Sequence, residues 1–149
     1  MALCIRTWKP EDIPAMVAHT FEWGFETTPD ELTAQLSRID NLDNAAVFVA
    51  EIDGSVAGRV FVAEHLTVGS RPFAEVHSLI VQQSFRRRGI GTALMEKAKE
   101  WSAVHGFKVL RLRTNTQRAE ANSFYPASGF KTEKQQNVYT INLDGGDMP

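Results

Sequence analysis

Glu75-Val-His-Ser-Leu-Ile-Val-Gln-Gln-Ser-Phe-Arg-Arg-Arg-Gly-Ile-Gly-Thr-Ala-Leu-Met95 is the stretch around which the chain is organised. Its apolar first half predicts a buried strand, and a short basic loop with two glycines leads from that strand into a helix. The first N–H groups of a helix lack partners within the helix, and the aligned peptide dipoles add partial positive charge there. Gly89 and Gly91 let a ligand approach the main chain. The stretch therefore predicts a cradle for phosphate.

The residues of this loop exclude two common nucleotide-binding motifs. A P-loop needs Lys and then Ser or Thr after its last glycine, whereas Gly91 is followed by Thr92 and Ala93. The dinucleotide fingerprint needs a third glycine at position 94, which is a leucine. What remains is an R-x-x-G-x-G arrangement over residues 86–91. Three arginines at this place favour phosphate, and the formal net charge of -2 argues against an extended nucleic-acid surface.

Length and composition are typical of one globular domain. The chain has 149 residues, of which 43% are hydrophobic, and we expect a single domain over residues 1–149 with a frayed tail at 144–149. No apolar run approaches the length that spans a membrane. Cys4 is the single cysteine, so an internal disulfide is excluded and a cytoplasmic location is the default expectation.

The pattern of apolar residues and turn signals predicts an α/β (α+β) chain. Strands are expected at residues 3–8, 46–52, 56–65, 73–81 and 108–114, with two short strands within 130–143. Helices are expected at residues 13–24, 29–39, 90–105 and 118–128. Asp12 is predicted to cap the first helix, and Thr28 with Glu31 forms a capping-box pattern for the second. Asp53-Gly54-Ser55 predicts a hairpin.

Two motifs in this order resemble signatures of the GNAT N-acetyltransferase superfamily. Arg86-Arg-Arg-Gly-Ile-Gly91 resembles its Q/R-x-x-G-x-G/A loop, and Ala121-Asn-Ser-Phe-Tyr-Pro-Ala-Ser-Gly-Phe130 resembles its A-x-x-F/L-Y-x-x-x-G-F segment. The predicted order β-α-α-β-β-β-α-β-α-β-β also matches, and the resemblance is weakest before residue 45. It implies a GNAT-like fold, with helices flanking a central mixed, mostly antiparallel sheet. It also implies acetyl-CoA as the cofactor.

The resemblance implies a coenzyme A site along the opening stretch. In the family, the strand before the loop splays from its neighbour and binds the pantetheine arm through its main chain, which here would be that of Leu79, Ile80 and Val81. Asn115 and Asn122 are further candidate contacts, and either could instead be a helix cap or a surface amide. Arg118 stands where the family often has Asn. The pyrophosphate would be held by Arg86, Arg87, Arg88, Gly89, Ile90, Gly91 and Thr92.

Tyr125 matches the family residue that protonates the departing thiolate. The chemistry is reasonable, because a phenol with a pKa of about 10 can donate to a thiolate whose parent thiol has a pKa of about 8.5. The alternative is a tyrosine that only packs on the core. Pro126 lies inside the predicted helix and disfavours helical geometry at Tyr125, so a kink is expected there.

A base is needed to take a proton from the amine, and His77 stands where the family often has Glu. An imidazole accepts a proton near neutral pH, directly or through water. The alternative for His77 is a hydrogen-bonded, half-buried ring. Glu75 is the second candidate for the base. Strand alternation without a bulge would place Glu75, His77, Leu79 and Val81 on one side.

The acceptor site is expected in the first two predicted helices. Glu22 and Glu26 are four residues apart, so on a helix they would share a face and attract a cationic amine, with Trp23 or Phe25 as an apolar wall. A solvated acidic face over buried aromatic residues is the alternative. The residues do not select among polyamines, amino acids, aminoglycosides and protein N-termini.

The sequence therefore predicts direct transfer of an acetyl group from acetyl-CoA to a primary amine of a small molecule or peptide in a ternary complex. Neither a metal ion nor a covalent enzyme intermediate is expected, and neither nucleic acid nor a membrane is an expected partner. A homodimer is allowed for. The alternative from a different class is a non-catalytic module that binds acyl-CoA and senses metabolic state.

Overall fold

The computed structural model describes residues 2–114 and 119–145 and divides into two compact units. The division falls between Arg113 and Thr114. The first unit contains the sheet and three of the helices, and the second contains one helix and the segment that follows it. Each unit is described by itself below.

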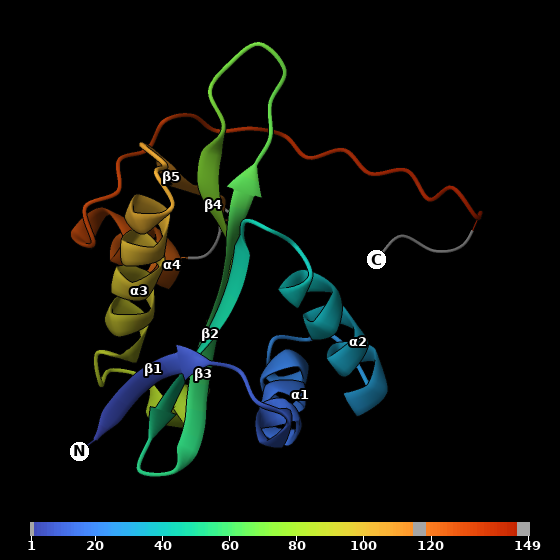
Figure 1. Cartoon of the computed structure of the whole chain (residues 1–149), viewed down its shortest axis with the longest axis vertical. Helices are drawn as coiled ribbons and strands as arrows, with labels where there is room; N and C mark the ends of the chain where they lie inside the picture. The colour runs from blue at the N-terminus through green and yellow to red at the C-terminus, as the bar shows by residue number, and fades with distance from the viewer. Residues whose placement is uncertain (1, 115–118, 146–149) are drawn as a thin grey trace. The chain divides into compact units, whose positions relative to one another are not determined.

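A mixed sheet of five strands forms the first unit (Figure 1). Its spatial order follows the chain, and the first four strands pair antiparallel, whereas the fifth runs parallel to the fourth. The predicted mixed, mostly antiparallel sheet is thus confirmed. The strands are β1 (Leu3–Thr7), β2 (Ala45–Ile52), β3 (Ser55–His65), β4 (Phe73–Val81) and β5 (Leu110–Leu112).

The tight turn between β2 and β3 is the predicted hairpin. Ile52 pairs with Ser55, so Asp53 and Gly54 alone form the loop. Both have positive φ, 50° and 83°, as a two-residue turn that matches the twist of the strands requires.

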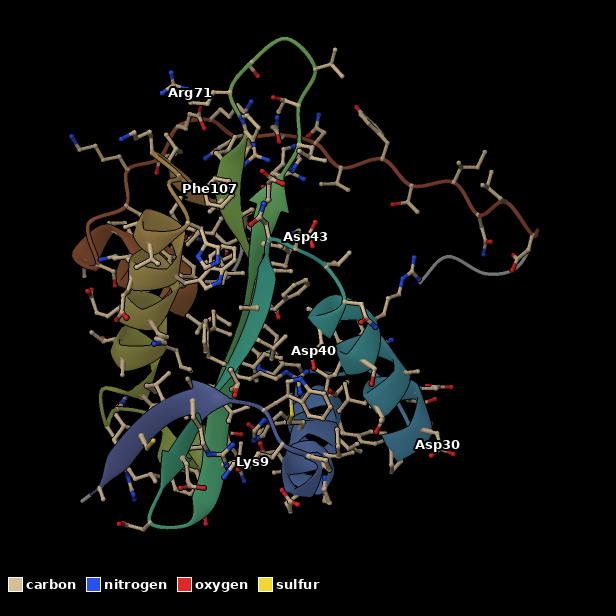
Figure 2. The ribbon with its side chains drawn as sticks, in the orientation of Figure 1. Lys9, Asp30, Asp40, Asp43, Arg71 and Phe107 are labelled. Atoms are coloured by element: carbon tan, nitrogen blue, oxygen red, sulfur yellow. The ribbon has the colours of Figure 1, made fainter. Side chains whose placement is uncertain are left out.

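Helices cover both faces of the sheet. Figure 1 shows α1 (Ile13–Glu22) and α2 (Pro29–Asp40) on one side and α3 (Ile90–Val104) on the other. Asp30 and Asp40, labelled in Figure 2, mark the two ends of α2. The core against α3 includes the buried side chains Ile90, Leu94, Met95, Ala98 and Trp101. The core between α1, α2 and β2 is formed by Ile13, Met16, Leu32, Leu36, Val47 and Val49.

The two predicted helix caps have different outcomes. Thr28 caps α2 as expected, because its hydroxyl oxygen accepts the Glu31 N–H at 3.1 Å. The prediction for Asp12 is wrong, since its side chain makes no capping bond to α1. Its carboxylate instead accepts hydrogen bonds from both terminal nitrogens of Arg6, at 2.8 and 2.9 Å, and from the Lys9 N–H at 2.7 Å. A guanidinium charge outcompetes the neutral N–H donors of a helix start.

The second unit contains α4 (Ala119–Ala127), with Pro126 inside it. Gly129, with φ of 96°, follows the helix as predicted. The two strands expected within residues 130–143 are not present there, so that part of the predicted order is wrong. Residues 131–137 are all polar, and the apolar side chains that follow them are exposed. No side-chain packing therefore stabilises a strand in this segment. Val138, Tyr139, Ile141 and Leu143 are 79 to 92% exposed.

Asp12 gives a test of the ion pairs that join β1, the first helical turn and β2. Burial acts to raise the pKa of the Asp12 carboxyl, but the hydrogen bonds from Arg6 and from the Lys9 N–H outweigh it and hold that pKa below its usual value. The stabilisation is therefore present above the unfolded-state pKa of about 3.9 and is lost as the pH falls below it. We expect Asp12→Asn to lower the free energy of unfolding by about 2 kcal/mol at neutral pH, measured in urea.

Glu11→Gln provides the matched control, because Glu11 is exposed in the same helical turn and the charge change is the same. This variant should change the free energy of unfolding by less than about 0.5 kcal/mol. The difference between the two variants should shrink toward pH 3. A difference that stays constant between pH 7 and pH 3 would show that the Asp12 charge is not responsible.

Candidate functional site

The candidate site begins where β4 ends and α3 starts, as the sequence predicts. β4 spans Phe73–Val81 and α3 begins at Ile90. A short 3-10 helix, Gln83–Phe85, and the three arginines connect them. This connection brings a strand, a basic loop and a helix N-terminus together in one part of the first unit.

The start of α3 has the features of an anion cradle. Its N-cap is Gly89, in the left-handed conformation with φ of 76°, and neither a capping side chain nor an acidic residue lies in its first turn. The first N–H groups of the helix are therefore left for a ligand. Arg87 also has a positive φ, 65°, which is unusual and costly for a non-glycine residue. Arg86, Arg87 and Arg88 are all exposed around this point.

A β-bulge interrupts the pairing of β4 with β3. Val62 pairs with Val76 and Phe61 pairs with Ser78, so His77 is an extra residue on β4. The His77 ring stacks on Phe61, with ring centroids 4.8 Å apart, and Phe61 packs against the core beneath α1 and α2. His77 therefore lies on that face of the sheet.

The bulge overturns the prediction that four side chains of β4 share one side. Glu75 pairs with Ala63, two residues along β3 from Phe61, so it lies on the same face as Phe61 and His77. Beyond the bulge the alternation is shifted, and Leu79 and Val81 point to the opposite face. The reason is the extra residue, which reverses the alternation of every side chain after it.

The pairing of β4 with β5 ends at the bulge. Their pairing covers Ala74 to Val76 of β4, and within the described residues β5 pairs with no later part of β4 (Figure 1). On the other side, the Gln82 N–H donates to the Ala57 carbonyl at 2.8 Å. Because the main chain of a strand faces its two neighbours alternately, Ile80 also faces β3, and the main chains of Leu79 and Val81 face the side where β5 pairs no further. We call this unpaired edge of β4 the gap. The main-chain contact predicted for Ile80 is not supported by this pairing.

Gly58 lets β3 and β4 lie close together beyond the bulge. A Cβ on Gly58 would lie 2.6 Å from the Ile80 carbonyl oxygen and 3.3 Å from the Leu94 side chain of α3. Only a residue without a side chain fits this contact. Gly58 was not among the residues predicted for the site, although a glycine inside an apolar strand is the signal that could have indicated it.

Glu75 is held in an ion pair with β5. Its Oε2 accepts hydrogen bonds from Nε and Nη2 of Arg111 on β5, at 2.9 and 2.6 Å, and its side chain is 8% exposed. Nδ1 of His65 lies 3.8 Å from the same oxygen, and Nε of Arg113 lies 4.0 Å from Oε1. Taking up a proton would weaken this ion pair, so Glu75 fits the role of base less well than His77.

His77 is exposed, and stacking on Phe61 is the contact that the structure gives it among the described residues. It is therefore not the hydrogen-bonded, half-buried ring that was the alternative. Its side chain lies on the face of the sheet that carries Glu75. An exposed imidazole next to the gap can exchange protons with a ligand or with water.

The predicted acidic face near residue 22 does not form. α1 ends at Glu22, and Gly24, with φ of 90°, leads the chain away, so Glu26 is outside the helix and cannot share its face. Oε1 of Glu22 accepts the Gln83 N–H at 2.5 Å and thereby holds the segment that follows β4. Trp23 is half-buried, and Phe25 is 63% exposed.

Two polar side chains between α1 and β3, the buried His19 and the half-buried Arg59, were also missed. His19 is completely buried and its Nε2 hydrogen-bonds the Val56 carbonyl at 3.2 Å. Arg59 donates to the Met16 carbonyl at 2.7 Å and to the Thr20 hydroxyl at 2.8 Å. Burial, and then the Arg59 charge, lower the pKa of His19, which favours its neutral form. Neither residue falls in the apolar spacing of α1 or β3, so hydrophobic periodicity gives no signal for them.

The remaining predicted residues belong to the second unit or lie outside the described residues. Asn115 and Arg118 are outside them. Asn122 and Tyr125 are half-buried on α4. The Tyr125 ring makes edge-on contacts with Phe124, at 5.3 Å between centroids, and with Phe130, at 6.1 Å.

Within residues 2–114 and 119–145, no group of three or more His, Cys, Asp or Glu side chains is arranged to hold a metal ion. Of the helices described, none combines the length and the apolar character needed to cross a bilayer.

The sequence of the chain is similar to those of known acetyltransferases. Residues 11–130 match the model of the acetyltransferase (GNAT) family. An uncharacterized N-acetyltransferase of Methanocaldococcus jannaschii is 34% identical over 96 residues, which cover 62% of this chain and 42% of that protein. The streptothricin acetyltransferase of Escherichia coli is 25% identical over 116 residues, or 75% of this chain and 64% of that protein. The match thus spans less than two thirds of each relative's length.

Solved structures share the fold. An aminoglycoside N-acetyltransferase in complex with CoA superposes with a TM-score of 0.84 at 20% identity, over 95% of this chain and 96% of that one. The same kind of enzyme bound to a bisubstrate analogue gives a TM-score of 0.83 at 20% identity, covering 96% of this chain and all of that one. At this identity the likeness concerns the fold alone.

Proposed function

Because the family model matches residues 11–130, the chain belongs to the acetyltransferase (GNAT) family, and we propose that it transfers an acetyl group from acetyl-CoA to a primary amine. The observation that carries this proposal is the open main chain of Leu79 and Val81 leading to the uncapped start of α3. The open main chain can bind the pantetheine arm that carries the thioester, and the helix start that follows it can bind the pyrophosphate. We also propose that both compact units form one catalytic domain, since the family match crosses the boundary between them.

The loop before α3 would hold the coenzyme phosphates. The N–H groups from Ile90 to Thr92 at the uncapped helix start would donate to a bound anion, and their partial positive charge would add to that of the arginines. Arg86, Arg87 and Arg88 are exposed and can reach pyrophosphate or ribose phosphate with paired hydrogen bonds.

The gap between β4 and β5 would hold the pantetheine arm and the thioester. Main-chain groups of Leu79 and Val81 can pair with the amides of the arm as a further strand would. An N–H from the same strand would stabilise the thioester oxygen as it gains negative charge. Asn122 on α4 is proposed as an additional polar contact to the coenzyme. Asn115 stays a prediction from the sequence.

The acetyl transfer needs one base and one acid. The amine nitrogen attacks the thioester carbonyl carbon, a C–N bond forms, and the proton lost by the nitrogen goes to His77 directly or through water. The C–S bond then breaks, and the thiolate takes a proton from the Tyr125 hydroxyl. The exposure of His77 and the ion pairing of Glu75 support this assignment of the base.

The acceptor would be a primary amine of a small molecule or a peptide. The exposed Phe25, with Trp23 beside it, is available as an apolar contact for it between α1 and α2. The single cysteine supports a cytoplasmic location. A homodimer stays a prediction.

One experiment separates catalysis from binding alone. Acetyl-CoA should raise the melting temperature, because a ligand present at 100 times its Kd adds about 2.7 kcal/mol to the stability of the folded state. A panel of primary amines should then yield free coenzyme A thiol with at least one member. Binding without thiol release for any amine would indicate a non-catalytic acyl-CoA module. Absence of binding would contradict both readings.

Tyr125→Phe tests the proposed acid. The change removes the donor and keeps the ring, so we expect kcat to fall about 100-fold or more while the Kd for acetyl-CoA stays within a factor of about two. Tyr139→Phe is the matched control, because Tyr139 is 89% exposed. Equal kcat values for the Tyr125 variant and the unaltered protein would remove Tyr125 from the mechanism.

His77→Gln tests the proposed base through the pH profile of kcat/KM. If the imidazole accepts the proton, the rising limb near neutral pH should disappear in the variant and the rate should fall about 100-fold. His105→Gln is the control, since His105 follows α3 and hydrogen-bonds the Trp101 carbonyl at 2.8 Å. A rising limb that survives in His77→Gln would assign the proton to Glu75 or to water.

A further inference from the structure

Basic side chains gather on one face of the sheet, at the point where β4 and β5 part. They are His65 of β3, Arg111 of β5 and Arg113 just after β5, and we call them the basic cluster. Glu75 of β4 is the carboxylate that lies among them. This face is the one that also carries the exposed His77.

Glu75 does not neutralise the basic cluster. Its two short hydrogen bonds to Arg111 use one guanidinium charge against one carboxylate charge. Arg113 is 57% exposed, and its Nε is 4.0 Å from Glu75 Oε1, which is longer than a hydrogen bond. Within residues 2–114 and 119–145, one guanidinium charge is therefore in excess, and the 36% exposed His65 can add to it when protonated.

The same contacts hold Arg111 in place and leave Arg113 available. The Arg111 guanidinium lies over the Phe73 ring, 4.3 Å from its centroid, and Phe73 stacks on His65 at 4.8 Å. Nε and Nη2 of Arg111 both donate hydrogen bonds to Glu75. Arg113 is two residues further along an extended chain, so it points to the same face without such packing.

Arg113 stands at the entrance of the gap that would hold the thioester. The last pair between β4 and β5 is Val76 with Leu112, and the next residues, His77 and Arg113, are the first on either side of the opening. An amine that attacks a thioester beside Leu79 must pass between them. Its other substituents then lie within reach of a guanidinium.

We infer that the acceptor is an amine that carries a carboxylate, such as an amino acid, and that Arg113 determines this specificity. The inference rests on the proposed acetyl transfer. A guanidinium binds a carboxylate through paired hydrogen bonds, whereas it repels the additional charges of a polyamine.

Matched acceptors test the inference. Each amino acid is compared with its own amide and with the amine that remains when the carboxyl group is removed, with release of coenzyme A thiol as the readout. The acceptor with a carboxylate should show a kcat/KM at least about tenfold higher, the worth of one charge-assisted hydrogen bond. Arg113→Gln should abolish this ratio, and Arg113→Lys should retain part of it.

Arg71→Gln is the control for loss of positive charge. Figure 2 shows Arg71 on the loop between β3 and β4, where it is exposed and makes none of the contacts described above. This variant should keep the preference for the carboxylate. Equal or faster reaction of the amides and decarboxylated amines would overturn the inference while the acetyl transfer stands. If none of the acceptors led to release of coenzyme A thiol, both the inference and the proposed acetyl transfer would be overturned.

Discussion

The extra residue that β4 accommodates at His77 is the constraint on which the candidate site depends. It reverses the alternation of the side chains, so Glu75 and His77 face one side of the sheet and Leu79 and Val81 face the other. Beyond it, β4 stays against β3, because Gly58 leaves room for the Ile80 carbonyl, while the pairing with β5 has ended. The main chain of β4 thus opens toward a gap without leaving the sheet, and it leads into the basic loop and α3.

The gap needs an anchor on its closed side, and Glu75 with Arg111 provides it. A buried carboxylate that loses its guanidinium partner typically costs about 3–5 kcal/mol, so this pair holds β5 to β4 just before they part. Glu22 has a similar part at the other end, where it binds the Gln83 N–H. Both acidic residues had been interpreted from the sequence as candidates for chemistry or substrate binding. In the structure their carboxylates are used to fix the strands and loop that form the site.

Local signals predicted the parts of the site that local chemistry decides. The bounds of β4 and the start of α3 agree with the sequence because an apolar run and a left-handed Gly89 define them without reference to other strands. The bulge could not be predicted, because it is defined by how the residues of β4 pair with those of β3 and not by the sequence of β4 alone. Asp12 was misassigned because Arg6, brought near by the fold, competes for it. Glu26 is a different case, because a local signal was present. Gly24 ends the helix between Glu22 and Glu26, so the four-residue spacing of the two carboxylates does not place them on one face.

The charge of the gap entrance also bears on how strong the base must be. A primary ammonium has a pKa of about 10, so at neutral pH only about one amine in a thousand is free to attack. Each unit by which nearby positive charge lowers that pKa raises the free fraction tenfold. His77 is exposed, and among the described residues no carboxylate orients it, which suits a base that receives protons from an amine already partly deprotonated. For an amine without a carboxylate, the excess charge of Arg113 would reduce the work left to His77. A carboxylate paired with Arg113 would cancel that charge, so the proton of an amino-acid amine would be left for His77 to remove.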